Sequence, residues 1–153
     1  MKANVKNPVY VGFWARFSAF FIDSLIVSIM LLPLTNTANL DIAILSDPVK
    51  SEAYLESLML QMGMELLFFG VLFILFWKIF AATPGKLLFK SYIVNADDFK
   101  PATSSQLIIR YFAYFLSLLP LGLGFLWIAL DKKKQAWHDK IAKTVVIREK
   151  PEA

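Results

Sequence analysis

The chain has 153 residues, of which 58% are hydrophobic and 18% are charged, and its mean hydropathy is +0.57. Soluble domains average roughly 45–50% apolar and about 25% charged residues, so the composition excludes a disordered chain, a soluble coiled coil and most soluble enzymes of this length. The absence of cysteine excludes disulfides and thiolate metal sites, and the net charge of +4 indicates membrane topology and contact with anionic lipid rather than nucleic acid.

The first membrane span is predicted over residues 11–34. As a helix it would be about 36 Å long, enough to cross a hydrocarbon core of about 30 Å with some tilt. A signal peptide is the competing interpretation. The apolar stretch is too long for that and contains Arg16 and Asp23, so we favour a span.

An acidic loop over residues 35–57 separates this span from a second one, predicted over 58–81. A helix beginning near Ser51 could continue into the second span. Residues 83–86, with the sequence Thr-Pro-Gly-Lys, then end the helix.

Two short segments rich in β-forming residues lie far apart in the chain, at 89–95 and 143–148. Each alone would leave its backbone groups without hydrogen-bond partners. We therefore expect the two segments to pair with each other outside the membrane.

The third apolar region, 104–130, contains Pro120, Gly122 and Gly124 in its middle. Proline removes a backbone donor and kinks a helix, and glycine weakens one, so two shorter helical pieces are expected. The predicted fold is an all-α membrane protein with two transmembrane helices and a broken third element. That element is either a re-entrant hairpin, which we favour, or a third full span.

Orientation follows from the lysines and arginines near the span ends. They are concentrated in the N-terminal segment, after the second span and in the tail 131–153, whereas the loop 35–57 is acidic. The N-terminus and the tail are therefore predicted to be cytoplasmic and the loop external. A single third full span would put the basic tail outside, against this rule.

Arg16 and Asp23 lie inside the first span, where each charge costs roughly 2.5–3.5 kcal/mol at the helix centre. Seven residues apart, they share one helix face to within about 20° but are separated by about 10.5 Å along the axis, so neither can pair closely with the other. We expect Arg16 to meet a C-terminal carboxylate, Asp139 or Asp131, and Asp23 to meet Arg110. Such pairs are either structural pins between helices or part of a transport pathway or proton site.

The remaining polar candidates have simpler interpretations. Glu65 is expected to be an acid at the membrane interface, and His138 an interfacial histidine that forms no catalytic dyad with Asp139. One histidine without cysteine is a weak basis for a metal site, and no cofactor is expected. The run Lys132 to Lys134 predicts attraction to anionic lipid.

The chain resembles the RDD family of bacterial membrane proteins over roughly residues 8–148. The matching segments are Gly12 to Phe17 with Asp23-Ser24, Thr83 to Lys86, Leu123 to Asp131, and Trp137 to Val146.

The family is named for an arginine and two aspartates, which by this resemblance are Arg16, Asp23 and Asp139, with Asp131 as an alternative for the last. Lys143 stands where relatives often have glycine. The resemblance implies the bacterial cytoplasmic (inner) membrane and a role in transport, since some members are described as sodium/proton antiporters.

Two functions remain as hypotheses for the single membrane domain 1–153, and a third is not favoured. The first is a transport or ion-exchange subunit built around the charge cluster Arg16, Asp23 and Asp139. The second is a membrane scaffold or accessory subunit without transport of its own. An intramembrane enzyme is not expected, because no nucleophile motif is present. The expected partners are the lipid bilayer and either a second copy of the chain or another membrane protein.

Overall fold

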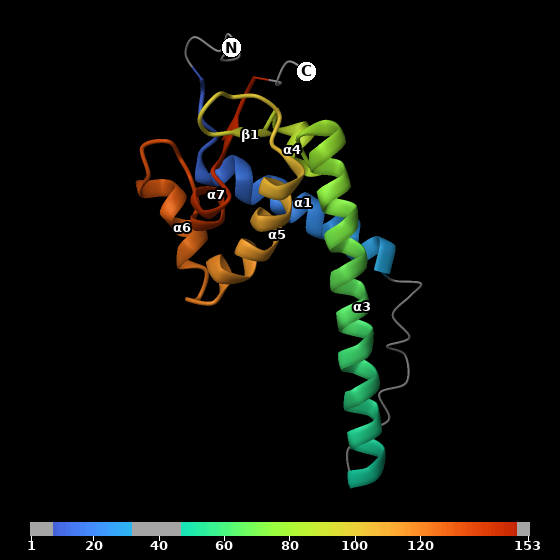
Figure 1. Ribbon diagram of the computed structural model, residues 1–153. Helices are drawn as coiled ribbons and strands as arrows, with labels where there is room; N and C mark the ends of the chain where they lie inside the picture. Colours follow the sequence, from blue (N-terminus) through green and yellow to red (C-terminus); the bar gives the residue numbers. More distant parts are fainter. Residues whose placement is uncertain (1–7, 32–46, 150–153) are drawn as a thin grey trace.

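The computed structural model describes residues 8–31 and 47–149 and is mostly helical (Figure 1). The helices and strands in chain order are α1 (Phe13–Leu31), α3 (Pro48–Phe80), α4 (Pro84–Leu88), β1 (Tyr92–Asn95), α5 (Ser104–Leu118), α6 (Leu123–Leu130), α7 (Trp137–Ile141) and β2 (Thr144–Ile147).

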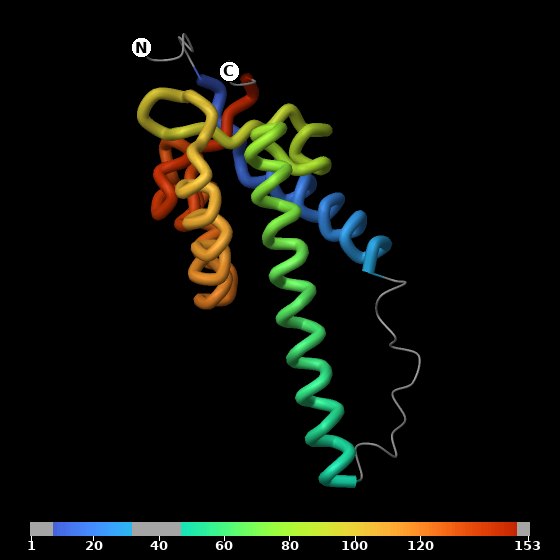
Figure 2. The backbone as a smooth tube through the Cα atoms, turned by 45° about the vertical axis from the view of Figure 1, so that its right-hand side comes forward, coloured from blue at the N-terminus to red at the C-terminus, as the bar shows by residue number. Residues whose placement is uncertain are grey.

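Two helices are long and apolar enough to cross a membrane, as predicted. α1 has 19 residues and α3 has 33. α1 runs obliquely beside the more upright α3 (Figures 1 and 2). The end of the first predicted span, 32–34, and the first part of the external loop, 35–46, lie outside the described residues.

α3 begins earlier than the predicted second span, so residues 48–57 are helical and do not belong to a loop. Its start is set by Asp47, whose carboxylate accepts hydrogen bonds from the backbone N–H groups of Val49 and Lys50. This cap satisfies donors that a helix start leaves free. At about 50 Å the helix exceeds the hydrocarbon thickness, so its first turns extend beyond it.

The third apolar region is broken, as predicted. α5 and α6 are bent by 100° relative to each other at the Pro120–Gly122 turn. Gly122 adopts φ +79°, and a Cβ on Gly124 would stand 2.6 Å from Ser117 Cα, so glycine permits both the turn and the close packing of its two arms. The pair forms a hairpin whose tip reaches only part of the way along α3 (Figure 2).

The predicted pairing of 89–95 with 143–148 is confirmed. β1 and β2 are antiparallel, and Tyr92 pairs with Ile147 while Asn95 pairs with Thr144. The segment before α1 joins them, because Val11 N donates to the Val146 carbonyl at 3.0 Å. The beginning and the end of the described chain therefore lie at the same end of the molecule (Figure 1).

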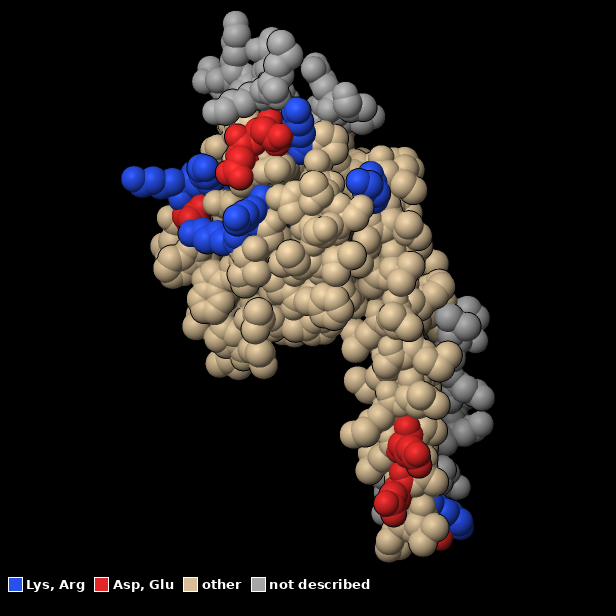
Figure 3. Space-filling view, viewed as in Figure 1, with Lys and Arg blue, Asp and Glu red and all other residues tan. Residues whose placement is uncertain are grey.

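The surface has the pattern of a membrane protein. On the face shown in Figure 3, charged side chains gather around the strands and near the far end of α3, and an uncharged zone separates them. Large apolar side chains are exposed along α1, α3 and the hairpin, including Trp14, Leu67 and Leu121. A small buried core at the strand end joins the segment before α1, α3, α5 and the two strands through Val11, Trp77, Ile93, Ala102, Leu107 and Val146.

Candidate functional site

Asp139 on α7 is the centre of a buried charge cluster and is completely inaccessible to solvent. Arg16 Nη1 from α1 donates to its Oδ2 at 2.5 Å, and Arg110 Nη1 from α5 donates to its Oδ1. The backbone N–H of Ala136 adds a bond of 2.9 Å to Oδ2. Burial by itself raises the pKa of the Asp139 carboxyl, but the positive charges of Arg110 and Arg16 outweigh burial and hold that pKa well below its usual range.

The two arginines also bind the chain around them. Arg16 Nε donates to the Val11 carbonyl at 3.0 Å and its Nη2 donates to the Lys134 carbonyl at 2.6 Å. Arg110 Nη1 donates to Thr144 Oγ1 at 2.7 Å. The cluster therefore joins α1, α5, α7 and the start of β2. The expectation that Arg16 meets a C-terminal carboxylate is confirmed, and the partner is Asp139.

The expected pairing of Asp23 with Arg110 is wrong. Asp23 Oδ2 accepts from Thr83 Oγ1 at 2.5 Å, and its Oδ1 accepts from the backbone N–H of Gly85 at 2.7 Å. The guanidinium of Arg110 is directed to Asp139 instead. The first turn of α4 provides a free N–H beside α1, and this neutral donor takes the place of the cation.

Lys86 is a buried cation that sequence reasoning did not single out. Lys86 comes directly after the Thr-Pro-Gly segment, and the residue is buried, with 7% of its surface exposed. Lys86 Nζ lies 3.4 Å from the half-buried Tyr114 hydroxyl and 5.5 Å from the centre of the Trp77 ring. The sequence signal that could have found it is its place in the Thr-Pro-Gly-Lys segment, directly after a helix-breaking turn.

His138 is buried, contrary to the expected interfacial position. Its ring stacks on Tyr114 with 4.0 Å between the ring centres. The ring of Phe125 also packs on it, with 5.2 Å between the ring centres. Its Nε2 lies 3.7 Å from Asp139 Oδ1, so these neighbours in sequence do approach each other. Burial lowers the pKa of the His138 imidazole well below its ordinary value, which keeps the ring neutral.

Asp131 and Glu65 lie apart from the cluster. Asp131 Oδ1 binds Lys140 Nζ at 2.5 Å. Burial raises the pKa of Asp131, but the hydrogen bonds from Lys140 and from the backbone of Gln135 and Lys133, with the charge of Lys140, together outweigh burial and lower the pKa. Glu65 accepts a hydrogen bond from Gln61 Nε2 at 2.9 Å on α3. In the parts of the chain that the structure describes, no three His, Asp or Glu side chains are placed to hold a metal ion.

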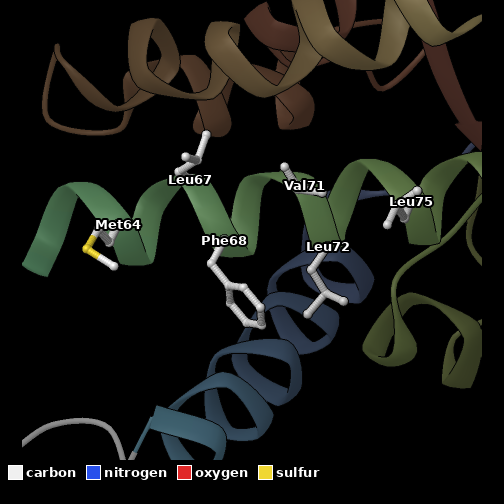
Figure 4. Close-up of a pocket in the computed structure, with 6 residues that line it drawn as sticks. All are labelled: Met64, Leu67, Phe68, Val71, Leu72 and Leu75. Atoms are coloured by element: carbon white, nitrogen blue, oxygen red, sulfur yellow. The ribbon is translucent and has the colours of Figure 1, made fainter.

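A groove along α3 lies away from these charges. Six apolar side chains line it, and Figure 4 shows them directed to both sides of α3, toward α1 and toward the hairpin. The lining residues are Met64, Leu67, Phe68, Val71, Leu72 and Leu75. The groove offers contact for lipid chains or apolar helices and contains no polar lining residue.

Comparison with known proteins agrees with this arrangement. The model of the RDD family matches residues 10–143, which includes Arg16, Asp23 and Asp139. The chain belongs to the RDD family. In this RDD protein the arginine and the second aspartate form one ion pair, while the first aspartate holds a separate helix turn.

This RDD protein is similar in sequence to proteins from two bacteria. It is 32% identical over 149 residues to the uncharacterized protein YxaI of Bacillus subtilis, covering 89% of this chain and 95% of the relative. It is 29% identical to the uncharacterized membrane protein YteJ of the same organism, covering 97% and 87%. It is 42% identical over 76 residues to the uncharacterized protein RP437 of Rickettsia prowazekii, covering 50% and 42%. No solved structure matches the chain significantly.

Proposed function

We propose that this RDD protein is a transport-related membrane protein of the ion-exchange class, of the sodium/proton type that the family resemblance implies. The proposal places it in the bacterial cytoplasmic membrane with the strand end in the cytoplasm. The proposal assigns no covalent chemistry to the protein.

The observation that carries the proposal is the broken hairpin packed against a buried charge cluster. Helical pieces that end within the membrane are tolerated where they pack on protein or line a water-filled cavity, and transporters use them at their binding sites. Here α5 provides Arg110, which binds Asp139 on α7. Intramembrane charges held on such an element are a functional-site hypothesis by default.

One group of side chains resembles a catalytic triad but is not accessible to a substrate, which supports the non-enzymatic part of the proposal. Ser117 Oγ lies 3.2 Å from His138 Nδ1, and His138 Nε2 lies 3.7 Å from Asp139, an order that resembles a nucleophile, a base and an acid. However, Ser117 is fully buried and its hydroxyl donates to the Ala113 carbonyl at 3.1 Å. A substrate carbonyl has no access to this oxygen.

The experiment is a flux measurement with the purified full-length protein in proteoliposomes. A sodium gradient should drive proton movement that a pH-sensitive dye inside the vesicles reports, and vesicles without protein give the background. Correctly folded protein that moves no protons under a sodium, potassium or lithium gradient would contradict the proposal.

Asp23 has two possible roles that one variant separates. Both of its oxygens accept from donors at the start of α4, the Thr83 hydroxyl just before the helix and the Gly85 backbone N–H in its first turn, so we assign it to holding α4 rather than to binding the coupling cation. Asp23→Asn keeps one accepting oxygen and should retain most of the flux. Complete loss of flux in a folded Asp23→Asn protein would make Asp23 the coupling carboxylate.

A second candidate function, an accessory subunit of a larger complex, is favoured by α3. Its N-terminal half continues past the hairpin tip (Figure 2) and exposes Met59 and Leu60 by 74% and 68%. Lipid or a partner helix could cover this surface. Cross-linking from an engineered photoreactive residue at Met59 in the native membrane distinguishes the two, because a single partner band supports the accessory role.

A further inference from the structure

The buried charges are balanced without Lys86. Arg16 and Arg110 are matched in sign by Asp23 and Asp139, and all four are at least nine-tenths buried. Lys86 adds one more buried cation, and within the described residues 8–31 and 47–149 no carboxylate lies within ion-pair distance of its Nζ. A buried charge without a counter-charge is strongly disfavoured, and losing a proton relieves it.

The surroundings of Lys86 offer few hydrogen-bond acceptors. Its polar neighbour is the Tyr114 hydroxyl at 3.4 Å, which also accepts from Arg110 Nη2 at 3.4 Å. Nearby, Trp77 Nε1 and Arg110 Nε are buried donors without a partner among the described residues. An ammonium group brings three donors to this place, whereas a neutral amine brings two and can itself accept.

The two buried aspartates, unlike Lys86, each have several hydrogen-bond partners. Asp139 receives bonds from two guanidinium groups and one backbone N–H, and Asp23 from a hydroxyl and a backbone N–H. Hydrogen bonds to the charged form of a carboxylate favour that form. Asp139, whose pKa is lowered, is therefore not suited to exchange protons.

We infer that Lys86, with Tyr114 as its hydrogen-bond partner, is the group that takes up and releases a proton in this protein. The inference deepens the proposed function and rests on it for its role in exchange. In one step the Lys86 ammonium gives a proton to water at the strand end of the molecule and becomes a neutral amine. In the reverse step the amine takes a proton from water, and the buried cluster gains one positive charge.

Charged and titratable groups face Lys86 from every element packed around it. They are Arg16 and Asp23 of α1, Arg110 and Tyr114 of α5, and His138 and Asp139 of α7. The arginines stay charged at any relevant pH, and Asp139 is held ionised by them. Lys86 is the member of this group that is a buried cation without a counter-charge, so loss of its proton removes a charge that no described carboxylate balances.

The first test observes the lysine directly and needs no transport. Nitrogen NMR of the side-chain Nζ atoms is recorded on the full-length protein with labelled lysine in nanodiscs over a pH series, and Lys86→Arg identifies the Lys86 signal. The expected result is a change from ammonium to amine at a pH where exposed lysines such as Lys90 remain ammonium. A Lys86 signal that changes together with the exposed lysines overturns the inference.

The second test uses the flux measurement with matched variants. Lys86→Arg keeps a positive charge that cannot be released and should abolish flux, whereas Lys90→Arg, an exposed change four residues away, should leave it unchanged. Unchanged flux in Lys86→Arg overturns the inference and leaves the proposed function standing. Absent flux in the unaltered protein, with the NMR change present, overturns the proposed function and supports the proton site.

Discussion

Asp139 joins α1, α5 and α7 through its two arginine partners. Replacing it by asparagine leaves Arg16 and Arg110 buried without a counter-charge. Breaking one partner out of a buried pair costs about 3–5 kcal/mol, so we expect Asp139→Asn to lower the free energy of unfolding by about that amount. Denaturant titration in detergent, followed by tryptophan fluorescence, measures it.

Asp131 provides the matched control for that change. It is also an aspartate bound to one cation, Lys140, but the lysine side chain is 43% exposed. A pair with one exposed partner contributes about 0–1 kcal/mol, and the oxygen of asparagine can still accept from the backbone N–H groups of Lys133 and Gln135, so Asp131→Asn should have little effect. Equal losses in the two variants would show that the Asp139 cluster contributes no more than a surface pair.

His138 gives the stability a pH dependence with a definite sign. Burial lowers the pKa of its imidazole in the folded state below the ordinary 6.5, so only the unfolded chain takes up a proton as the pH falls through that value. Stability should therefore be complete above pH 6.5 and decline below it, by up to about 1.4 kcal/mol per pH unit. Unfolding of the unaltered protein and of His138→Phe, measured at several pH values, tests this.

The variant should lose the decline that begins near pH 6.5, because phenylalanine does not titrate and fills the same place between Tyr114 and Phe125. Asp139 adds a separate decline, since the pKa of its carboxyl is depressed and its stabilisation is lost only below its ordinary value of about 3.9. An identical pH profile for both proteins above pH 5 or so would contradict the assignment to His138.

At the scale of elements, the contact between α1 and α4 depends on the absence of a side chain at Gly85. A Cβ there would meet the Ala19 carbonyl oxygen and stand 2.9 Å from Asp23 Cγ. Overpacking of this kind costs about 1–3 kcal/mol, so Gly85→Ala should destabilise the protein by that amount. Gly12→Ala is the control, because nothing lies within 4 Å of a Cβ there. Thermal unfolding of both variants tests this prediction. An unchanged stability of Gly85→Ala would contradict the close contact between α1 and α4.

Elements were predictable from sequence where one local signal decides the structure. Pro120 and Gly122 break the third region, and the two β-forming segments pair with each other. The start of α3 was predicted too late, because the Asp47-Pro48 cap lies well before the apolar run. The partner of Asp23 depends on competition between a cation and a free backbone N–H, which the order of residues along the chain does not reveal.

At the scale of the whole molecule, the number of crossings decides which surfaces share a compartment. α1 and α3 are the two candidate spans, and the hairpin of α5 and α6 returns the chain to the end where Arg148 N donates to the Val9 carbonyl at 3.0 Å. One crossing by each of these two helices predicts that the residues before α1, the basic segment after α6 and β2 lie on one side of the membrane. It predicts the start of α3 on the other side.

Cysteine scanning tests this arrangement against a clean background, because the chain has no cysteine of its own. A membrane-impermeant thiol reagent applied to intact cells should label Val49→Cys, whose side chain is 77% exposed at the start of α3. Lys132→Cys should react only after the membrane is opened. Leu121→Cys lies at the hairpin tip and is 97% exposed. It should react in neither condition, since a re-entrant hairpin is predicted to end in hydrocarbon. Labelling of both Val49→Cys and Lys132→Cys on intact cells would instead require three full crossings, and the hairpin could then not return to the strand end.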